Sequence, residues 1–180
     1  MVCAEDAISI YRSLTAHGIP AWIGGGWGID ALLRKQTRPH KDLDIIVRLD
    51  DVVPMRELLS SLGYHLKELW SENSWVVDPR GVETPTAFVL QDADGREVDA
   101  HAMRLDDQGN GTPAWTNDEG LIFQSEDLAG EGLIAGCSVR CLSPRMQLRF
   151  HTGYDLPKVQ FQDLELLHEL LSIGLIGDSH

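Results

Sequence analysis

The amino-acid sequence predicts an α+β fold with a helical C-terminal part. Apolar residues recur at helical spacing in residues 4–17 and again in residues 156–174. "LDIIVRL" (43–49) is rich in the β-branched residues that favour strands. "TAFVLQ" and "REVDAHAM" flank "DADG", whose Asp-Gly pair is a strong hairpin signal. No repeat, low-complexity tract or linker interrupts the chain, so we predict a single domain over residues 1–180, with residues 143–180 as its helical part.

Local signals set the elements of the N-terminal half. Gly18 and Pro20 stop the first helix, and a short strand that ends in glycines follows. An Asp cap opens the helix after the β-branched strand, and Gly63 lies just past its end. The predicted elements are, in order, helix 4–17, strand 20–25, a helix with Ile29, Leu32 and Leu33 on its buried side, strand 43–49 and helix 50–64.

The C-terminal half begins with the hairpin, and a polar loop over residues 104–120 follows it. "GLIAGCSVRCLS" (132–143) predicts a second hairpin. Ser143 and Pro144 form a favourable N-cap and first-turn pair, so we predict a helix over residues 144–151. The long amphipathic helix then ends the chain, and its acidic residues Asp163 and Glu165 are predicted to lie on its solvent-facing side.

The composition excludes some classes of function. The chain has 28 Asp and Glu residues but only 15 Lys and Arg residues, so its formal net charge is −13. Because nucleic acids bind to basic surfaces, no nucleic-acid partner is predicted, whereas a cationic small molecule would be attracted. No apolar run approaches the roughly 20 residues that span a bilayer, and the N-terminus lacks the pattern of a signal peptide. The three cysteines lack zinc or redox spacing and are predicted to be unpaired. We therefore expect a cytoplasmic protein without a membrane partner.

"GGGWGID" (24–30) is a glycine-rich stretch at a predicted strand-to-helix turn. Such a turn exposes backbone N–H groups where the helix dipole begins, which favours a bound phosphate. The spacing is neither that of the phosphate-loop NTPases nor the G-x-G-x-x-G of dinucleotide-binding folds. The alternative is an ordinary tight turn, and the glycines by themselves do not decide between the two.

Two acidic residues, Asp42 and Asp44, open the β-branched strand. Strand residues two apart point to the same face, about 6.6 Å apart along the chain. Leu43 and Ile45 fall on the opposite face and anchor the strand in the core. Two carboxylates directed at one point repel each other unless a cation lies between them, and Mg²⁺ prefers such oxygen ligands. The alternative is a solvated, charged end of an ordinary strand.

A further candidate carboxylate lies in "REVDAHAM", where Glu97, Asp99 and His101 alternate with apolar residues. One interpretation is a sheet with one solvated face. The other places this strand beside the strand of Asp42 and Asp44, so that its acids complete a metal cluster. Mg²⁺ that bridges carboxylates to a triphosphate is the arrangement used for nucleotidyl transfer.

The stretch "GGGWGIDALLRKQTRPHKDLDIIV" resembles the small antibiotic nucleotidyltransferases of the polymerase-β-like superfamily, which include the lincosamide and aminoglycoside 2''-nucleotidyltransferases. The family pattern is G-G-W-x-x-D, a helix, T-R-x-H-x-D-x-D and then a V-D-x-H strand. The matching residues here are Gly25, Gly26, Trp27, Asp30, Thr37, Arg38, His40, Asp42, Asp44, Val98, Asp99 and His101. "FHTGYDL" (150–156) is similar to the ending of the lincosamide group.

The resemblance implies the polymerase-β-like nucleotidyltransferase fold, which is a mixed sheet with flanking helices, and a role for each matching residue. Asp42 and Asp44 would ligate Mg²⁺, and Asp99 would be a third metal ligand, the general base, or both. Gly25 and Gly26 would hold the triphosphate of ATP or another NTP, together with Arg38 and His40. The wider superfamily has a serine after its first glycine, where this chain has Gly26. Phosphate contact would therefore rest on backbone N–H groups.

The implied activity is Mg²⁺-dependent transfer of a nucleoside monophosphate, AMP from ATP, to a hydroxyl of a small basic molecule such as a lincosamide or aminoglycoside. Candidate acceptor-pocket residues are His101, His151 and Tyr154, of which the last two would otherwise form a homodimer contact. His101 would either orient Asp99 or face solvent. Two alternative functions are nucleotidylation of a protein partner, such as a toxin, and nucleotide binding without turnover. The tryptophans Trp22 and Trp27 are predicted to belong to the core.

Overall fold

The computed structural model describes residues 1–77, 81–115, 120–150 and 158–177. Within these residues, eight strands form one mixed sheet in the order β3-β6-β7-β2-β1-β10-β9, and β8 pairs with β7. β2 runs parallel to β7 and β1 parallel to β10, whereas the other neighbours are antiparallel. The predicted mixed sheet is therefore confirmed.

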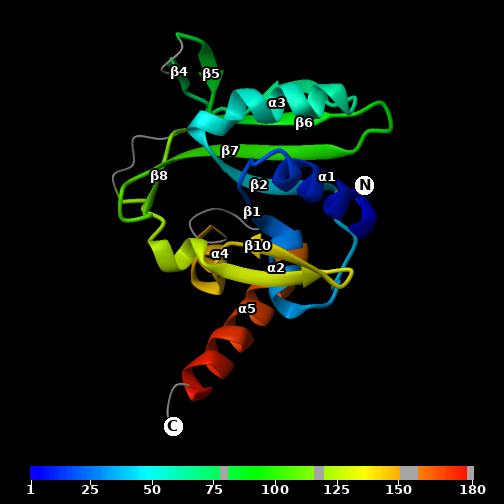
Figure 1. Ribbon diagram of the computed structural model, residues 1–180. Coiled ribbons are helices and arrows are strands. Elements are labelled where there is room, and N and C mark those ends of the chain that lie inside the picture. The colour runs from blue at the N-terminus through cyan, green and yellow to red at the C-terminus, as the bar shows by residue number, and fades with distance from the viewer. Residues whose placement is uncertain (78–80, 116–119, 151–157, 178–180) are drawn as a thin grey trace.

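The strands of this sheet are β1 (Ala21–Ile23), β2 (Asp42–Arg48), β3 (His65–Leu69), β6 (Ala87–Gln91), β7 (Glu97–Leu105), β8 (Gly111–Pro113), β9 (Gly130–Ile134) and β10 (Cys137–Cys141). A separate hairpin, β4 (Trp75–Val77) and β5 (Glu83–Pro85), projects from the body of the molecule (Figure 1). The helices are α1 (Ala4–Ala16), α2 (Gly25–Leu33), α3 (Val52–Ser61), α4 (Pro144–Phe150) and α5 (Lys158–Gly177), with short 3₁₀ turns at Leu49–Asp51 and Ser125–Leu128.

One face of the sheet carries the main hydrophobic core. Alternate residues of β2 and β7, such as Leu43, Ile45 and Val98, are fully buried there against apolar residues of α1 and α3. Figure 1 shows these two helices lying along the sheet. Each fully buried side chain of this size stabilises the fold by about 1.5–3 kcal/mol. This packing holds β2 and β7 in place, which matters because the same strands carry acidic residues on their other face.

The opposite face of the sheet has apolar cover over only part of its area. Ile46 of β2 belongs to a second hydrophobic cluster on this face, which also includes Trp22, Met103, Trp115 and Met146 of α4. Asp42 and Asp44 share this face with Ile46 because they lie four and two residues before it. The apolar cover therefore ends where the carboxylates begin. Trp22 and Trp27 are both buried, as predicted for core residues.

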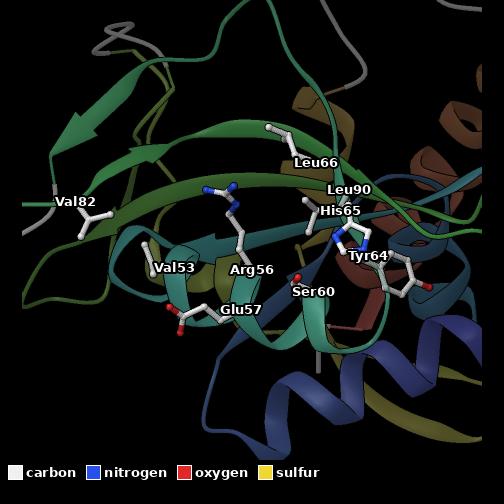
Figure 2. A pocket seen from close by; sticks show the side chains of 9 residues that line it. All are labelled: Val53, Arg56, Glu57, Ser60, Tyr64, His65, Leu66, Val82 and Leu90. Carbon is white, nitrogen blue, oxygen red and sulfur yellow. The ribbon is translucent and has the colours of Figure 1, made fainter.

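A groove with a volume of about 520 Å³ lies between α3 and the edge strand β3 (Figure 2). Arg56 extends from α3 toward the sheet, and its guanidinium carbon lies 5.7 Å from the centre of the Phe88 ring. The groove is lined by the paired residues Leu66 and Leu90. In the alternation of β6 and β7, Leu90 faces away from Asp99, so this groove and the acidic face lie on opposite sides of the sheet.

Both predicted hairpins and the predicted helices are present in the described residues, apart from small differences at their ends. The strands β3, β4, β5 and β8 were not predicted, and β8 lies inside the stretch interpreted as a loop over residues 104–120. All five residues of β3 are exposed, so the strand shows no alternation of apolar and polar residues. The three cysteines are unpaired, as predicted. None of the helices in the described ranges is long and apolar enough to cross a bilayer.

Candidate active site

The parallel pairing of β2 with β7 brings the predicted carboxylates together. Asp42 lies opposite Glu97, and Asp44 lies opposite Asp99. Neighbouring strands are about 4.8 Å apart, and residues with the same alternation share a face. Four carboxylates therefore gather on the face that the core leaves uncovered. Asp99 and Glu97 are 8% and 5% exposed, so they are largely removed from water.

The electrostatics of these four residues differ. Burial, reinforced by the charges of Asp42 and Asp99, raises the pKa of Asp44 to about 8. Burial and the charge of Asp99 also raise the pKa of Asp42. Burial would raise the pKa of Glu97 too, but ion pairs with Lys67 and Lys41 at 2.9 and 3.0 Å outweigh it and lower that pKa. Glu97 is thus neutralised by the protein, whereas Asp42 and Asp44 favour a bound cation.

The donor set fits an open magnesium site. Mg²⁺ is usually bound by one or two carboxylates and completes its shell with water and substrate phosphates. Among the described residues, no group of three or more His, Cys, Asp or Glu side chains is placed so that it could hold a metal ion. A pair of acidic oxygens from Asp42 and Asp44, beside a turn suited to phosphate, is what an open site of this kind needs.

Asp99 has two neighbours that the sequence alone does not place. The indole Nε1 of Trp70 donates a 2.8 Å hydrogen bond to its Oδ1. Nδ1 of His101 lies 3.4 Å from the same oxygen, and the Nε2 of His101 lies 3.4 Å from Glu72. Burial works against protonation of His101, but the hydrogen bonds with Asp99 and Glu72 raise its pKa to about 9. Of the two roles considered for His101, its position supports contact with Asp99.

The glycine turn is joined directly to the carboxylate strand. Gly24 caps α2, and its N–H donates a 2.9 Å hydrogen bond to the backbone carbonyl of Asp44. Gly25 has a φ of +54°, and a Cβ added there would overlap the Asp44 carboxylate. The first N–H groups of a helix have no intrahelical acceptor, and the helix dipole favours an anion beside them. The turn therefore places a helix start that is suited to an anion next to the acidic pair.

Gly25→Ala is expected to impair both stability and nucleotide binding. A left-handed backbone costs a residue with a Cβ about 1–2 kcal/mol, and the new methyl group would also displace the Asp44 carboxylate. Gly95→Ala is a matched control, because Gly95 also has a positive φ but has open space around an added Cβ. Both variants should lose about 2–8 °C in melting temperature. Only Gly25→Ala should weaken MgATP binding, by about tenfold or more in calorimetry; equal affinities would contradict the assignment of the turn.

The predicted phosphate residue His40 lies beneath the turn and is only 3% exposed. Its Nε2 is 2.5 Å from Oδ2 of Asp30, whose other oxygen accepts a 2.6 Å hydrogen bond from the Thr37 hydroxyl. A Cβ on Gly26 would overlap the His40 ring. His40 therefore supports the glycine turn from below, and any contribution to phosphate binding would be indirect.

Arg38 is held by the C-terminal helix. Its guanidinium pairs with Asp163 of α5 at 2.7 Å and keeps 24% of its side-chain surface exposed. The prediction that Asp163 faces solvent is wrong, since this carboxylate is only 1% exposed; Glu165 is exposed, as predicted. The ion pair fixes Arg38 beside the turn that it was predicted to assist. The candidate acceptor residues His151 and Tyr154 lie outside the described residues.

Sequence reasoning missed Trp70, Glu72 and the two lysines that neutralise Glu97. Trp70 follows an exposed edge strand without a periodic signal, and Glu72 lies in the loop after it. Lys41 directly precedes Asp42, and a basic residue beside an acidic pair is the one signal that was available. The other contacts depend on which strands pair, and a single sequence does not show that.

Fold and site together define the class of the protein, an enzyme that transfers nucleotides. Comparison with known proteins gives the same class and makes it more specific. The chain belongs to the aminoglycoside-2''-adenylyltransferase family, whose model matches residues 6–167. The family that the sequence motifs suggested is therefore confirmed.

The relatives include enzymes named for both kinds of antibiotic. A lincosamide resistance protein of Staphylococcus haemolyticus is 29% identical over 149 residues, which cover 83% of this chain and 84% of the relative. A 2''-aminoglycoside nucleotidyltransferase of Escherichia coli is 30% identical over 142 residues, which cover 74% of this chain but 66% of the relative. These relatives place the chain among the antibiotic nucleotidyltransferases.

Solved structures confirm the predicted fold. The lincomycin-bound lincosamide antibiotic adenylyltransferase LnuA is 28% identical with a TM-score of 0.76, and the match covers 94% of this chain and 98% of LnuA. The structure of ANT(2'')-Ia with adenylyl-2''-tobramycin has a TM-score of 0.71 at 21% identity, and the match covers 97% of this chain and 92% of ANT(2'')-Ia. At this identity, the similarity to ANT(2'')-Ia shows only that the two proteins share a fold.

Proposed function

We propose that the protein transfers AMP from ATP to a hydroxyl of a small basic antibiotic in a Mg²⁺-dependent reaction. The observation that carries this proposal is the register of β2 and β7, which sets Asp44 beside Asp99. Membership of the family supports the class of reaction. The pairing provides one carboxylate pair for a metal and, on the adjacent strand, a separate carboxylate for the acceptor.

Asp42 and Asp44 would hold the Mg²⁺, and the pKa values of both are raised by burial and by the charge of Asp99. When bound, the metal would neutralise charge on the triphosphate and on the departing pyrophosphate. The first N–H groups of α2 and the guanidinium of Arg38 would bind the remaining phosphate oxygens. Binding in this way aligns the α-phosphorus for attack by the acceptor, and such alignment is a large part of catalysis.

Asp99 would act as the general base. The acceptor hydroxyl oxygen forms a bond to the α-phosphorus, the bond between that phosphorus and the bridging oxygen breaks, and pyrophosphate leaves. The proton of the hydroxyl passes to Asp99. A base on β7 can approach the acceptor without displacing the ligands on β2, because the two strands are neighbours in the sheet.

The proposed acceptor is an amine-bearing antibiotic, and we favour a lincosamide over an aminoglycoside. A net charge of −13 and an acidic sheet face attract cations. The alignment with the lincosamide resistance protein spans 84% of that relative, against 66% for the aminoglycoside enzyme. LnuA, whose structure contains lincomycin, is covered over 98% of its length.

The test is a panel of acceptors incubated with labelled ATP and Mg²⁺, scored for pyrophosphate release and for the mass of the product. Lincomycin, an aminoglycoside and a neutral polyol should be compared at low and high salt. We expect lincomycin to gain one AMP group. The KM of a cationic acceptor should rise severalfold between about 0.05 and 0.5 M salt, because added salt shortens the range of electrostatic attraction. Preference for the polyol would contradict the electrostatic basis. AMP transfer only to a co-expressed protein would replace the proposed acceptor.

A further inference from the structure

The edge strand β3 contains a one-residue bulge. Leu66 pairs with Leu90 of β6, but the next pair along the strands is Glu68 with Val89, so Lys67 is an extra residue. A bulge reverses the alternation of side chains beyond it, and bulges are frequent next to active sites. Here the reversal affects the segment that leads to Trp70.

The bulge determines what Trp70 can reach. Residues three apart on a regular strand point to opposite faces, so Lys67 and Trp70 would not share one. With the extra residue both side chains reach the acidic face of β7. Lys67 contacts Glu97 at 2.9 Å, and the indole N–H of Trp70 contacts Oδ1 of Asp99 at 2.8 Å. The irregularity of β3 therefore delivers a hydrogen-bond donor to the proposed base.

We propose that Trp70 is a positioning residue for Asp99. Its indole N–H fixes Oδ1, and Oδ2 is left for the acceptor hydroxyl. Among the described residues, Oδ2 of Asp99 makes no hydrogen bond. The inference rests on the proposed function, because it assigns a partner to the residue that would take the proton.

The segment after Trp70 is fixed before any substrate arrives. The N–H of Trp70 donates to the carbonyl of Ala87, and the Trp70 carbonyl accepts from Asn73, at 3.1 and 3.0 Å. The side-chain carbonyl of Asn73 accepts hydrogen bonds from the N–H groups of Thr86 and Ala87, at 2.8 and 3.1 Å. The loop is thereby tied to the start of β6, the neighbour of β7. A donor held in this way can orient Asp99 without an entropy cost at each turnover.

Trp70 is 38% exposed, so its ring is not a core element whose loss would unfold the protein. The substitution Trp70→Phe keeps an aromatic ring but removes the N–H donor, together with the five-membered ring of the indole. Trp75→Phe is the matched control, because Trp75 is 55% exposed and its indole has no hydrogen bond among the described residues. The comparison separates the effect of the donor from the effect of changing an exposed indole.

Trp70→Phe is expected to lower kcat about 10- to 100-fold, the range for a lost hydrogen bond to a charged group. KM for both substrates, the Kd of MgATP and the melting temperature should stay within about twofold or 2 °C of wild type, which a merely structural role would not allow. Trp75→Phe should leave kcat within twofold. The Trp70→Phe/Asp99→Asn double variant should be no slower than Asp99→Asn alone, since both changes act through one carboxylate.

A second measurement does not depend on turnover. The chain has five tryptophans, and the indole ¹⁵N–¹H signal that is missing in Trp70→Phe identifies Trp70. In the Asp99→Asn variant this signal should move and exchange faster with solvent, while the Trp75 signal stays in place. An unmoved signal, or a kcat of Trp70→Phe equal to wild type while Asp99→Asn is impaired, would overturn the inference and leave the proposed function standing. Full activity of Asp99→Asn would instead contradict the assignment of Asp99 as the general base, and the proposed role of Trp70 would fail with it.

Discussion

Replacing Asp44 with Asn is expected to lower the rate of nucleotidyl transfer by about 10³-fold or more. The change removes one negative charge from the pair that would hold Mg²⁺, and the metal's neutralisation of phosphate charge is worth several kcal/mol. Binding of MgATP should weaken at the same time, because the metal links protein and triphosphate. Pyrophosphate release measures the rate, and calorimetry measures the affinity.

The matched control is Glu131→Gln, which removes the same charge from an exposed position on β9. It should leave kcat within twofold, since Glu131 lies on the outer strand of the sheet. A folded Asp44→Asn variant with wild-type turnover would show that the metal is held elsewhere. The class of enzyme would be unaffected by that result, but the assignment of Asp42 and Asp44 would be wrong.

The same variant has a stability readout with a definite sign. Burial, with the charges of Asp42 and Asp99, raises the pKa of Asp44 to about 8, so between pH 4 and 8 the folded protein keeps a proton that the unfolded chain has lost. Metal-free wild type should therefore lose stability as the pH rises through this window. Because the Asn side chain cannot ionise, the Asp44→Asn variant should lose less folding stability over the same pH range. Denaturant titrations at pH 5 and 8 in the presence of a chelator would measure the free energy of unfolding of both proteins. Added Mg²⁺ should reduce the loss of stability of the wild type between the two pH values.

Asp99→Asn is expected to lower kcat by about 10²- to 10⁴-fold, the usual contribution of a general base. The Kd of MgATP should change little, because the triphosphate would be held by the turn and by the pair on β2. Glu97 is the competing candidate, since it lies on the same face two residues earlier. Its ion pairs with Lys67 and Lys41 already occupy both carboxylate oxygens.

Glu97→Gln should therefore cost less activity than Asp99→Asn and should act mainly on stability. The two variants remove the same charge from the same strand, so each controls for the other. A larger loss of kcat in Glu97→Gln would mean that the general base had been assigned to the wrong residue. Single-turnover measurements with saturating MgATP would keep substrate binding out of the comparison.

The sequence predicted the parts of the site that depend on local rules. Alternation along a strand places Asp42 and Asp44 on one face whatever the neighbours are, and the structure shows both there. A glycine run after a short strand predicts a helix start, and α2 begins at Gly25. The Asp-Gly turn predicted the hairpin that carries Asp99. The sequence also allowed a simpler interpretation for each part, and only the family resemblance joined the parts before the structure was known.

The remaining contacts depend on long-range pairing. The two strands that carry Asp44 and Asp99 are 55 residues apart in sequence, and no local pattern fixes their register. Asp163 looked like a solvated residue because its partner, Arg38, lies 125 residues away. Trp70 depends on a bulge in a strand whose residues are all exposed, so neither burial nor periodicity indicated its direction.

The bulge at Lys67 has a consequence for how such a protein can evolve. Deletion of Lys67 would remove the bulge, but Glu68 and Leu69 would keep their pairing with Val89 and Phe88, and β2 and β7 would keep their registers. Trp70 would therefore still point toward Asp99. The loss would fall on Glu97, which would keep only Lys41 as a cationic partner among the described residues. When sequences of this family are aligned, a one-residue gap at this position of β3 should be read as the loss of a lysine beside Glu97, and not as a reversal of Trp70.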